Sequence, residues 1–248
     1  MRVGTFNIRT GLGCDGFNSW PFRRRATAAA IKAVDADVIG LQEVHGFQRR
    51  YLERQAPGWR WFGLGRSGRN SGEQCPITVT NPELDVVTHQ TRWYGPPPAL
   101  PGTQLPGASF PRIATLVRCR GRRDGTEFDV INTHLDEHID ANRLTSVRQL
   151  VAWIDQAVPT VVLGDFNAEP SNAAVLGPLA DAGFEMADVT GGTSHGFTGT
   201  ADGSQIDHIF LSRHWAVEDC AVVRENSNGR LPSDHWPVRA TVSLTGTL

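Results

Sequence analysis

The sequence predicts an α/β fold in which two stacked mixed β-sheets are flanked by helices. The first observation is that short apolar or alternating segments, typical of strands, outnumber helical segments. The second is that several of these strands follow one another with no helix between them, whereas a simple parallel sheet needs a crossover after each strand. The third is that no repeat, low-complexity tract or linker divides residues 1–248. We therefore expect a single domain.

Each element follows from a local pattern. Pro21 suits the first position of an alanine-rich helix that runs to about Val34. The clearest helix, residues 140–157, has apolar residues at steps of three and four. Further helices are predicted over residues 46–56 and from the end of the 159–164 strand to about Gly183. Strands are predicted over residues 2–8, 37–41, 59–64, 76–80, 113–119, 128–133, 159–164, 206–211, 216–223 and 236–244.

Residues 92–112 form the most unusual stretch. It holds six prolines together with Trp93, Tyr94 and Phe110. A loop of this length without secondary structure is usually functional or disordered. Prolines reduce the entropy lost when a loop becomes ordered, and exposed aromatic rings are unfavourable in water. We therefore expect an ordered flap near the functional site rather than a linker.

Composition limits the class of protein. The formal net charge is -2, and Lys32 is the only lysine, which argues against a protein that coats nucleic acid by bulk charge. No apolar run reaches the length of a membrane span, and the chain opens on a strand rather than on a signal peptide. The four cysteines are widely spaced, which favours free thiols over a disulfide frame or a zinc site. We expect a cytoplasmic protein with no membrane partner.

Polar residues recur where the predicted strands end. In Val161–Ala168, four apolar residues lead into Asp165 and Asn167, which share one face of the extended backbone. Similar residues end other strands, and the whole set is Asn7, Glu43, His134, Asp165, Asn167, Asp207, Asp234 and His235. Singly, each has a structural explanation, such as a turn, an arginine pair or a hydrogen-bonded core histidine. Together they form an oxygen-rich set suited to Mg²⁺ or Mn²⁺, with two histidines for acid–base chemistry.

Six ordered motifs resemble those of the endonuclease/exonuclease/phosphatase superfamily. They are Phe6-Asn7-Ile8-Arg9, Leu41-Gln42-Glu43-Val44, Asn132-Thr133-His134-Leu135, Gly164-Asp165-Phe166-Asn167, Ile206-Asp207-His208-Ile209-Phe210 and Ser233-Asp234-His235-Trp236-Pro237-Val238. The resemblance implies a deoxyribonuclease-I-like, four-layered α/β sandwich and a Mg²⁺-dependent phosphoesterase. It is nearest to small bacterial members. Arg9 and His208 depart from the pattern of AP endonucleases and of many other members, which argues against repair of abasic sites.

The resemblance also implies a role for each site residue. Glu43 would be the main metal ligand, with Asn7 and Asp234 beside it. Asp165 would orient or deprotonate the attacking water and Asn167 would hold a phosphate oxygen, both of them close enough to share the metal.

The remaining roles concern the histidines and the substrate. The resemblance implies that Asp207 polarises the catalytic histidine, His235, and that His134 contacts the phosphate or assists the leaving group. Glu73 is a looser match to an acidic residue that steadies His134. Arg112 and His195 are candidates to bind substrate phosphate, although a pairing of Arg112 with a surface carboxylate is an equal alternative.

The expected function is hydrolysis of a phosphomonoester or phosphodiester with Mg²⁺, or Mn²⁺ as its substitute. Near-neutral charge and the proline-rich loop favour a phosphorylated small molecule or a nucleotide. A DNA or RNA nuclease is the first alternative, and it would lose activity steeply with added salt. A catalytically silent binding module and a biosynthetic enzyme on the same fold are the others. The oligomeric state is left open.

Overall fold

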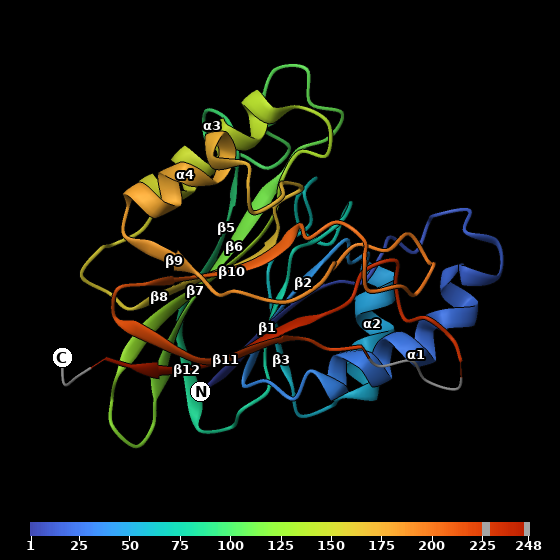
Figure 1. Ribbon diagram of the computed structural model, residues 1–248, viewed down its shortest axis with the longest axis horizontal. Helices are drawn as coiled ribbons and strands as arrows, with labels where there is room; N and C mark the ends of the chain where they lie inside the picture. Colours follow the sequence, from blue (N-terminus) through green and yellow to red (C-terminus); the bar gives the residue numbers. More distant parts are fainter. Residues whose placement is uncertain (225–228, 246–248) are drawn as a thin grey trace.

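The computed structural model describes residues 1–224 and 229–245. Its core is a pair of six-stranded sheets stacked face to face, with helices on the outside of each (Figure 1). The α/β sandwich expected from the sequence is confirmed. None of the helices in the described part of the chain is long and apolar enough to cross a membrane.

The first sheet has the strand order β11-β12-β1-β2-β4-β3. Its outer face is covered by helices α1 and α2 (Figure 1). The bounds of its elements are β1 Arg2–Asn7, α1 Trp20–Ala33, β2 Val38–Gln42, α2 Gly46–Gln55, β3 Arg60–Phe62, β4 Ile77–Val79, β11 Trp215–Val222 and β12 Val238–Leu244.

The second sheet has the order β5-β6-β7-β8-β10-β9 and carries helices α3 and α4 (Figure 1). The bounds of its elements are β5 Leu84–Trp93, β6 Ile113–Gly121, β7 Glu127–His134, α3 Asp140–Ala152, β8 Thr160–Asp165, α4 Ala173–Asp181, β9 Phe184–Met186 and β10 Asp207–Ser212.

Apolar strand faces explain the layers. One core cluster lies between the sheets and includes Val3, Val38, Val161 and Ile209, all fully buried. Two further clusters lie under the helices: one between the first sheet and α1 and α2, and one between the second sheet and α3 and α4. Central strands such as β8 are buried on both faces, which is why they read as continuous apolar runs.

Each sheet contains one parallel pair, β1 with β2 and β7 with β8. The two pairs face each other, and their close approach explains a glycine: a Cβ on Gly40 would lie 2.1 Å from Leu163 Cδ1. Beside it, Gln42 Nε2 donates to Asn132 Oδ1 at 2.6 Å, and Asn132 Nδ2 donates to the Leu41 carbonyl at 2.8 Å. These bonds join the sheets and fix the relative position of the four strand ends.

Three predictions for individual elements were wrong or incomplete. Strand β5 was not predicted, because its residues are mostly exposed along the sheet edge and show little apolar alternation. The short strand β9 was missed as well. Helix α3 ends at Ala152 rather than at 157, since the chain turns there and the Ala157 N–H donates to Asp155 Oδ1.

The proline-rich loop is anchored more deeply than expected. Trp93 belongs to β5, and Tyr94 is fully buried with its hydroxyl 2.8 Å from Thr133 Oγ1. Phe110 remains exposed and covers the guanidinium of Arg66, whose Cζ lies 4.1 Å from the ring centroid. The loop is therefore fastened to the core at its start, beside the end of β7, and its last residues, Pro111 and Arg112, line a pocket with Glu43 and His134.

Candidate active site

The polar residues predicted at strand ends come together at one edge of the sandwich. Asn7 ends β1, Glu43 follows β2, His134 ends β7 and Asp165 ends β8. Asn7 of the first sheet donates from Nδ2 to Asp165 Oδ2 of the second at 2.9 Å. The carboxyl ends of both parallel pairs therefore meet, as expected for a site in an α/β protein.

Local backbone geometry positions Asp165. Gly164 has φ 150°, and a Cβ there would lie 2.1 Å from the Thr133 carbonyl oxygen, so only glycine fits so close to β7. Asn167 takes a left-handed conformation with φ 49°, and its N–H donates to Asp165 Oδ1 at 2.9 Å. Its side chain donates to the Leu135 carbonyl at 3.1 Å. The Asp-Phe-Asn turn thus fixes the carboxylate in one orientation.

Two histidines flank this carboxylate. His235 Nδ1 lies 2.8 Å from Asp207 Oδ2, and its other nitrogen, Nε2, lies 4.0 Å from Asp165 Oδ2. Asp207 opens β10 directly opposite Asp165 in the antiparallel register. His134 Nε2 lies 3.7 Å from the same Asp165 oxygen. All four side chains are buried, so their charges interact in a medium that screens them weakly.

Burial and neighbouring charges shift these groups in different directions. Burial lowers the pKa of His235, but the nearby carboxylates, Asp207 above all, outweigh it and raise that pKa to about 10. Burial, followed by the positive charges of Arg112 and His235, holds the pKa of His134 well below its usual range. Burial and the charge of Asp207 raise the pKa of Asp165. At neutral pH the site therefore holds one charged and one neutral imidazole beside a carboxylate that binds a proton more readily than an ordinary aspartate.

The other half of the site is built on Glu43. Its Oε1 accepts from Asn7 Nδ2 at 2.9 Å and its Oε2 from the Thr10 N–H at 2.6 Å. Asp234 Oδ2 lies 3.5 Å from Arg9 Nη1, and Arg9 is also paired with Asp15. Glu43 itself has φ 61°, a conformation that side chains rarely adopt and that often marks functional sites.

A buried arginine that the sequence analysis missed holds this half together. Arg23 of α1 is fully buried and donates to backbone carbonyls of the loop after β1 and of the segment before Asp234. Ser233 Oγ donates to the Asn7 carbonyl at 2.7 Å. These bonds fix Arg9 and Asp234 relative to β1. The run of three arginines in α1 does not reveal from sequence which one faces inward.

The donor set fits a hard divalent cation. Carboxylate oxygens of Glu43 and Asp165 converge on one atom, Asn7 Nδ2, and Asp234 is close to the same loop. Asp165, Asp207 and His235 also have ligand atoms close enough to hold an ion. In that cluster, however, a 2.8 Å hydrogen bond already occupies the space between Asp207 and His235. On the side of Glu43 the carboxylates face a carboxamide and a backbone N–H rather than an imidazole, so these oxygens are also candidates to hold a cation.

Hydrogen bonds on both sides orient the carboxamide of Asn7. Its Oδ1 accepts from the Arg9 N–H at 2.9 Å, so its nitrogen rather than its oxygen faces the carboxylates. Hydrogen-bond partners on both sides are consistent with this orientation of the carboxamide. Asn7 is thus a donor that holds Glu43 and Asp165 together.

Glu73 and Arg112 line a small pocket beside Glu43 and His134. Glu73 accepts from Arg66 Nη1 at 2.8 Å and lies 3.9 Å from His45 Nε2; within the described residues it makes no hydrogen bond to His134. This contact differs from the expected pairing of Glu73 with His134. Arg112 is only 9% exposed, and the described part of the chain supplies no ion pair for its guanidinium. The alternative of a surface carboxylate as its partner therefore finds no support there.

The two other histidines that the sequence analysis singled out, His195 and His208, differ in their surroundings. His195 accepts from the Gly199 N–H through Nδ1, and its buried Nε2 has no partner among the described residues. Its ring centroid lies 4.5 Å from that of Trp236, next to His235 in the chain. His208 packs between Phe166 and Phe210 and bonds the Ala168 carbonyl at 2.8 Å, so it fills a core position.

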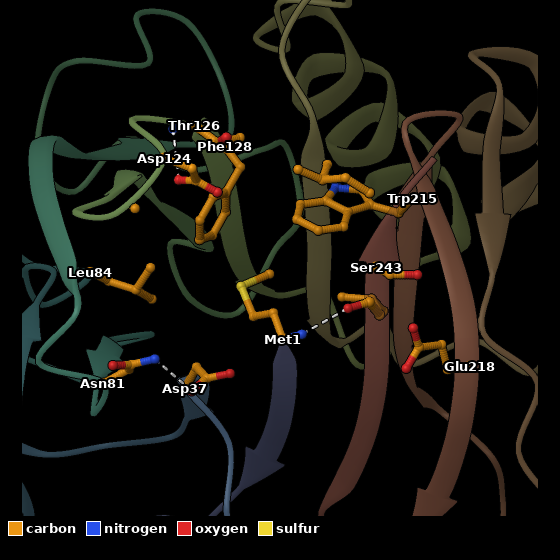
Figure 2. Close-up of a pocket in the computed structure, with 13 residues that line it drawn as sticks. Met1, Asp37, Asn81, Leu84, Asp124, Thr126, Phe128, Trp215, Glu218 and Ser243 are labelled. Carbon is orange, nitrogen blue, oxygen red and sulfur yellow. Dashed lines mark hydrogen bonds between the residues drawn. The ribbon is translucent and has the colours of Figure 1, made fainter. Parts of the chain in front are cut away.

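A cavity of about 450 Å³ lies at the opposite end of the sandwich (Figure 2). Its walls include the apolar side chains of Leu84, Phe128 and Trp215, with the start of β1 at Met1 in the middle. Its carboxylates lie at the edge of the cavity, and no histidine lines it. This cavity therefore lies apart from the histidines and from Asp165.

Similar proteins share this arrangement of the whole chain. An endonuclease/exonuclease/phosphatase from Bacteroides vulgatus is 31% identical, with 98% of each chain covered and a TM-score of 0.89. A conserved protein of unknown function from Enterococcus faecalis V583 is 28% identical, with 98% of this chain and 100% of that one covered and a TM-score of 0.90. A mannosyl-6-phosphatase from Bacteroides thetaiotaomicron VPI-5482 has a TM-score of 0.91 over 98% of this chain and 100% of that one. Its 24% identity shows the fold alone.

No curated protein sequence matches the chain. The sequence model described as the Endonuclease/Exonuclease/phosphatase family matches residues 4–235, nearly the full length. Its span includes every strand end that contributes to the site. The chain belongs to the endonuclease/exonuclease/phosphatase family.

Proposed function

We propose that this protein is a divalent-metal-dependent phosphoesterase that hydrolyses a phosphate ester of a small or nucleotide-sized molecule. The observation that carries the proposal is Asp165, a buried carboxylate with a histidine nitrogen 3.7 Å away on one side and 4.0 Å away on the other. One histidine is charged through Asp207 and the other is neutral. The arrangement therefore places a base (Asp165), a charged imidazolium (His235) and a neutral imidazole (His134) close together.

Glu43, Asp165 and Asp234 would hold Mg²⁺, or Mn²⁺ in its place, with Asn167 beside them and Asn7 orienting the carboxylates. A cation there would neutralise charge on the phosphate. Asp165 has the raised pKa that suits a group accepting a proton from water. The His235 imidazolium, held by Asp207, adds positive charge where the phosphorus centre becomes more negative. His134, neutral at physiological pH, is placed to hydrogen-bond the ester or the leaving oxygen.

Arg112 supports a phosphate as the group that is bound. A buried guanidinium without an anionic partner is unfavourable, and phosphate supplies the bidentate acceptor that it lacks. It shares the pocket with His134, so a phosphate bound by both would lie against Asp165. His195, with its unpartnered Nε2 next to the His235 segment, is a second candidate for this contact.

The small pocket and the net charge of -2 favour a compact substrate over duplex nucleic acid. One protein of the same fold is named a mannosyl-6-phosphatase, which is compatible with a substrate of this size. A nuclease activity is the rival to be tested alongside.

The test is a hydrolysis panel with Mg²⁺, Mn²⁺ or EDTA. It holds p-nitrophenyl phosphate, bis-p-nitrophenyl phosphate, sugar phosphates, nucleotides, plasmid DNA and short RNA, with Asp165→Ala as the control. We expect metal-dependent turnover of a small ester that is absent in the variant. Cleavage of DNA or RNA alone, with steep loss at moderate salt, would replace the proposal by the nuclease. No turnover of any substrate would leave a binding or biosynthetic role.

A further inference from the structure

Large apolar side chains gather on the solvent side of the active site. Leu12, Phe17, Phe22 and Phe47 are 68, 84, 55 and 36% exposed, respectively. We call these four residues the apolar patch. They come from the loop between β1 and α1, from the first turn of α1 and from the first turn of α2. Exposed phenylalanine and leucine are unfavourable in water, and a group of them usually marks a binding surface.

Contacts group the members of the patch into two pairs. The rings of Phe17 and Phe22 lie 6.3 Å apart between centroids. Phe47 packs against Gly11, where a Cβ would lie 2.5 Å from the ring, and Gly11 precedes Leu12. The loop between β1 and α1 stands at the periphery of the molecule, outside both sheets (Figure 1).

The same loop is bonded directly to the site. The Thr10 N–H donates to Glu43 Oε2 at 2.6 Å, and the Gly11 N–H donates to Gln48 Oε1 at 3.0 Å. Phe47 stacks on His45, with ring centroids 5.7 Å apart. Any large surface that covers the patch therefore lies close to Glu43, the proposed main metal ligand.

Cations surround the apolar patch. Phe22 and Arg25 are both exposed and lie three residues apart, so they share the outward face of α1. Arg24 and Arg50 are exposed on the neighbouring turns of α1 and α2. The nearby carboxylates Asp15 and Glu53 are engaged by Arg9 and Arg49. Within the described residues Arg24, Arg25 and Arg50 make no ion pair, so unpaired positive charge lies close to the patch although the chain as a whole carries a formal charge of -2.

We propose that this face binds the surface of an anionic phospholipid membrane. Projecting apolar side chains insert among acyl chains, and flanking arginines pair with anionic headgroups; the two contributions together give the reversible attachment that either alone gives poorly. The charge complementarity favours lipid over a second copy of this chain, whose own surface here is positive. The absence of a membrane-spanning segment, on which the expectation of no membrane partner rested, has no bearing on binding of this kind.

The experiment measures binding without turnover. Full-length protein is sedimented with vesicles of phosphatidylcholine plus phosphatidylglycerol, or of phosphatidylcholine alone, in EDTA so that no ester is hydrolysed. The variant Leu12→Ser/Phe17→Ser removes the two most exposed patch residues. Val87→Ser is the matched control, since Val87 is 40% exposed on the distant edge strand β5. Arg25→Gln tests the charge contribution separately.

We expect wild-type protein to bind the anionic vesicles and the double variant to bind at least about tenfold less. Val87→Ser should bind like wild type, and Arg25→Gln should weaken binding mainly at low salt. No binding of wild type, or equal loss in the Val87 control, would overturn the proposal. So would a dimer in size-exclusion chromatography that the double variant dissociates. Because no catalysis is measured, this result stands whether or not the proposed phosphoesterase activity is found.

Discussion

The two ends of the sandwich differ in how their charged side chains are satisfied. At the end opposite the site, Asp37 accepts from the Arg2 N–H at 2.7 Å and from Asn81 Nδ2 at 2.9 Å, so both carboxylate oxygens are bonded (Figure 2). At the site, Asp207 Oδ1 is buried without a partner in the described residues, and Arg112 has no counter-ion there. Native proteins rarely leave such groups unpaired unless they have a role.

The volume of a cavity is a poor guide to function in this protein. The cavity at the far end is ligand-sized, yet its walls are largely apolar and its unpartnered buried donor is the neutral indole N–H of Trp215. The pocket beside Glu43 is much smaller but is surrounded by groups with perturbed pKa values. Reactivity follows from desolvated charge, which the buried groups His134, Asp165 and His235 provide near Glu43.

Exchanging a single oxygen for nitrogen at Asp165 should have the largest effect on activity. The Asp165→Asn variant cannot accept a proton, and we expect kcat/KM to fall about 10³-fold or more. The protein should stay folded, because the loss of repulsion between Asp165 and Asp207 offsets the one hydrogen bond, from Asn7 or Asn167, that the new carboxamide nitrogen cannot accept. Steady-state kinetics and thermal unfolding measure both. A variant that kept most of its activity would show that the role assigned to Asp165 is wrong.

Glu43→Gln should have the second-largest effect on activity, and this effect should depend on the metal concentration. The substitution keeps shape but removes a charge from the proposed cation site, so the metal concentration for half-maximal activity should rise about tenfold or more. Titration of activity with Mg²⁺ and Mn²⁺ measures the shift. Activity should be partly rescued at high metal concentration, which Asp165→Asn does not allow. If no metal concentration raised the rate, Glu43 would have a role other than metal binding.

Asp207→Asn should change the pH dependence of activity more than the rate at its optimum. Asp207 raises the pKa of His235, so the imidazolium persists well above neutrality in the native site. Without that charge the histidine loses its proton at lower pH, and the alkaline limb of the kcat/KM profile should move down by about one pH unit or more. A profile that coincides with that of wild type would exclude a protonated His235 from the mechanism.

Asp37→Ala at the far end should leave the activity unchanged. It removes the acceptor for the Arg2 N–H and for Asn81, so we expect a loss of about 1–3 kcal/mol in the free energy of unfolding. Chemical denaturation measures the loss, and kcat/KM at a temperature where the variant is folded provides the comparison. A clear fall in kcat/KM there would mean that the two ends are coupled through the sheets.

Much of the site could be predicted because its residues follow buried strands. The motifs at Asn7, Glu43, His134 and Asp165 occur where apolar runs stop, and the carboxyl ends of the parallel strands share one edge. Strand β5 could not be predicted in the same way, since an exposed edge strand lacks alternation. The pairing of Glu73 with Arg66 was also missed, because both lie in a loop whose path has no periodic signal.

The sequence by itself determined the α/β class, the family and the identity of the residues at the strand ends, since hydrophobic period and ordered motifs are local properties. Only the tertiary structure decided which of them touch. The register of β8 and β10 places Asp207 opposite Asp165, and the segment just before β12 brings His235 close to both. Burial of Arg23 and exposure of Phe17 are likewise properties of packing between distant segments. Periodicity indicates which face of an element is buried, but not which distant side chains it meets there.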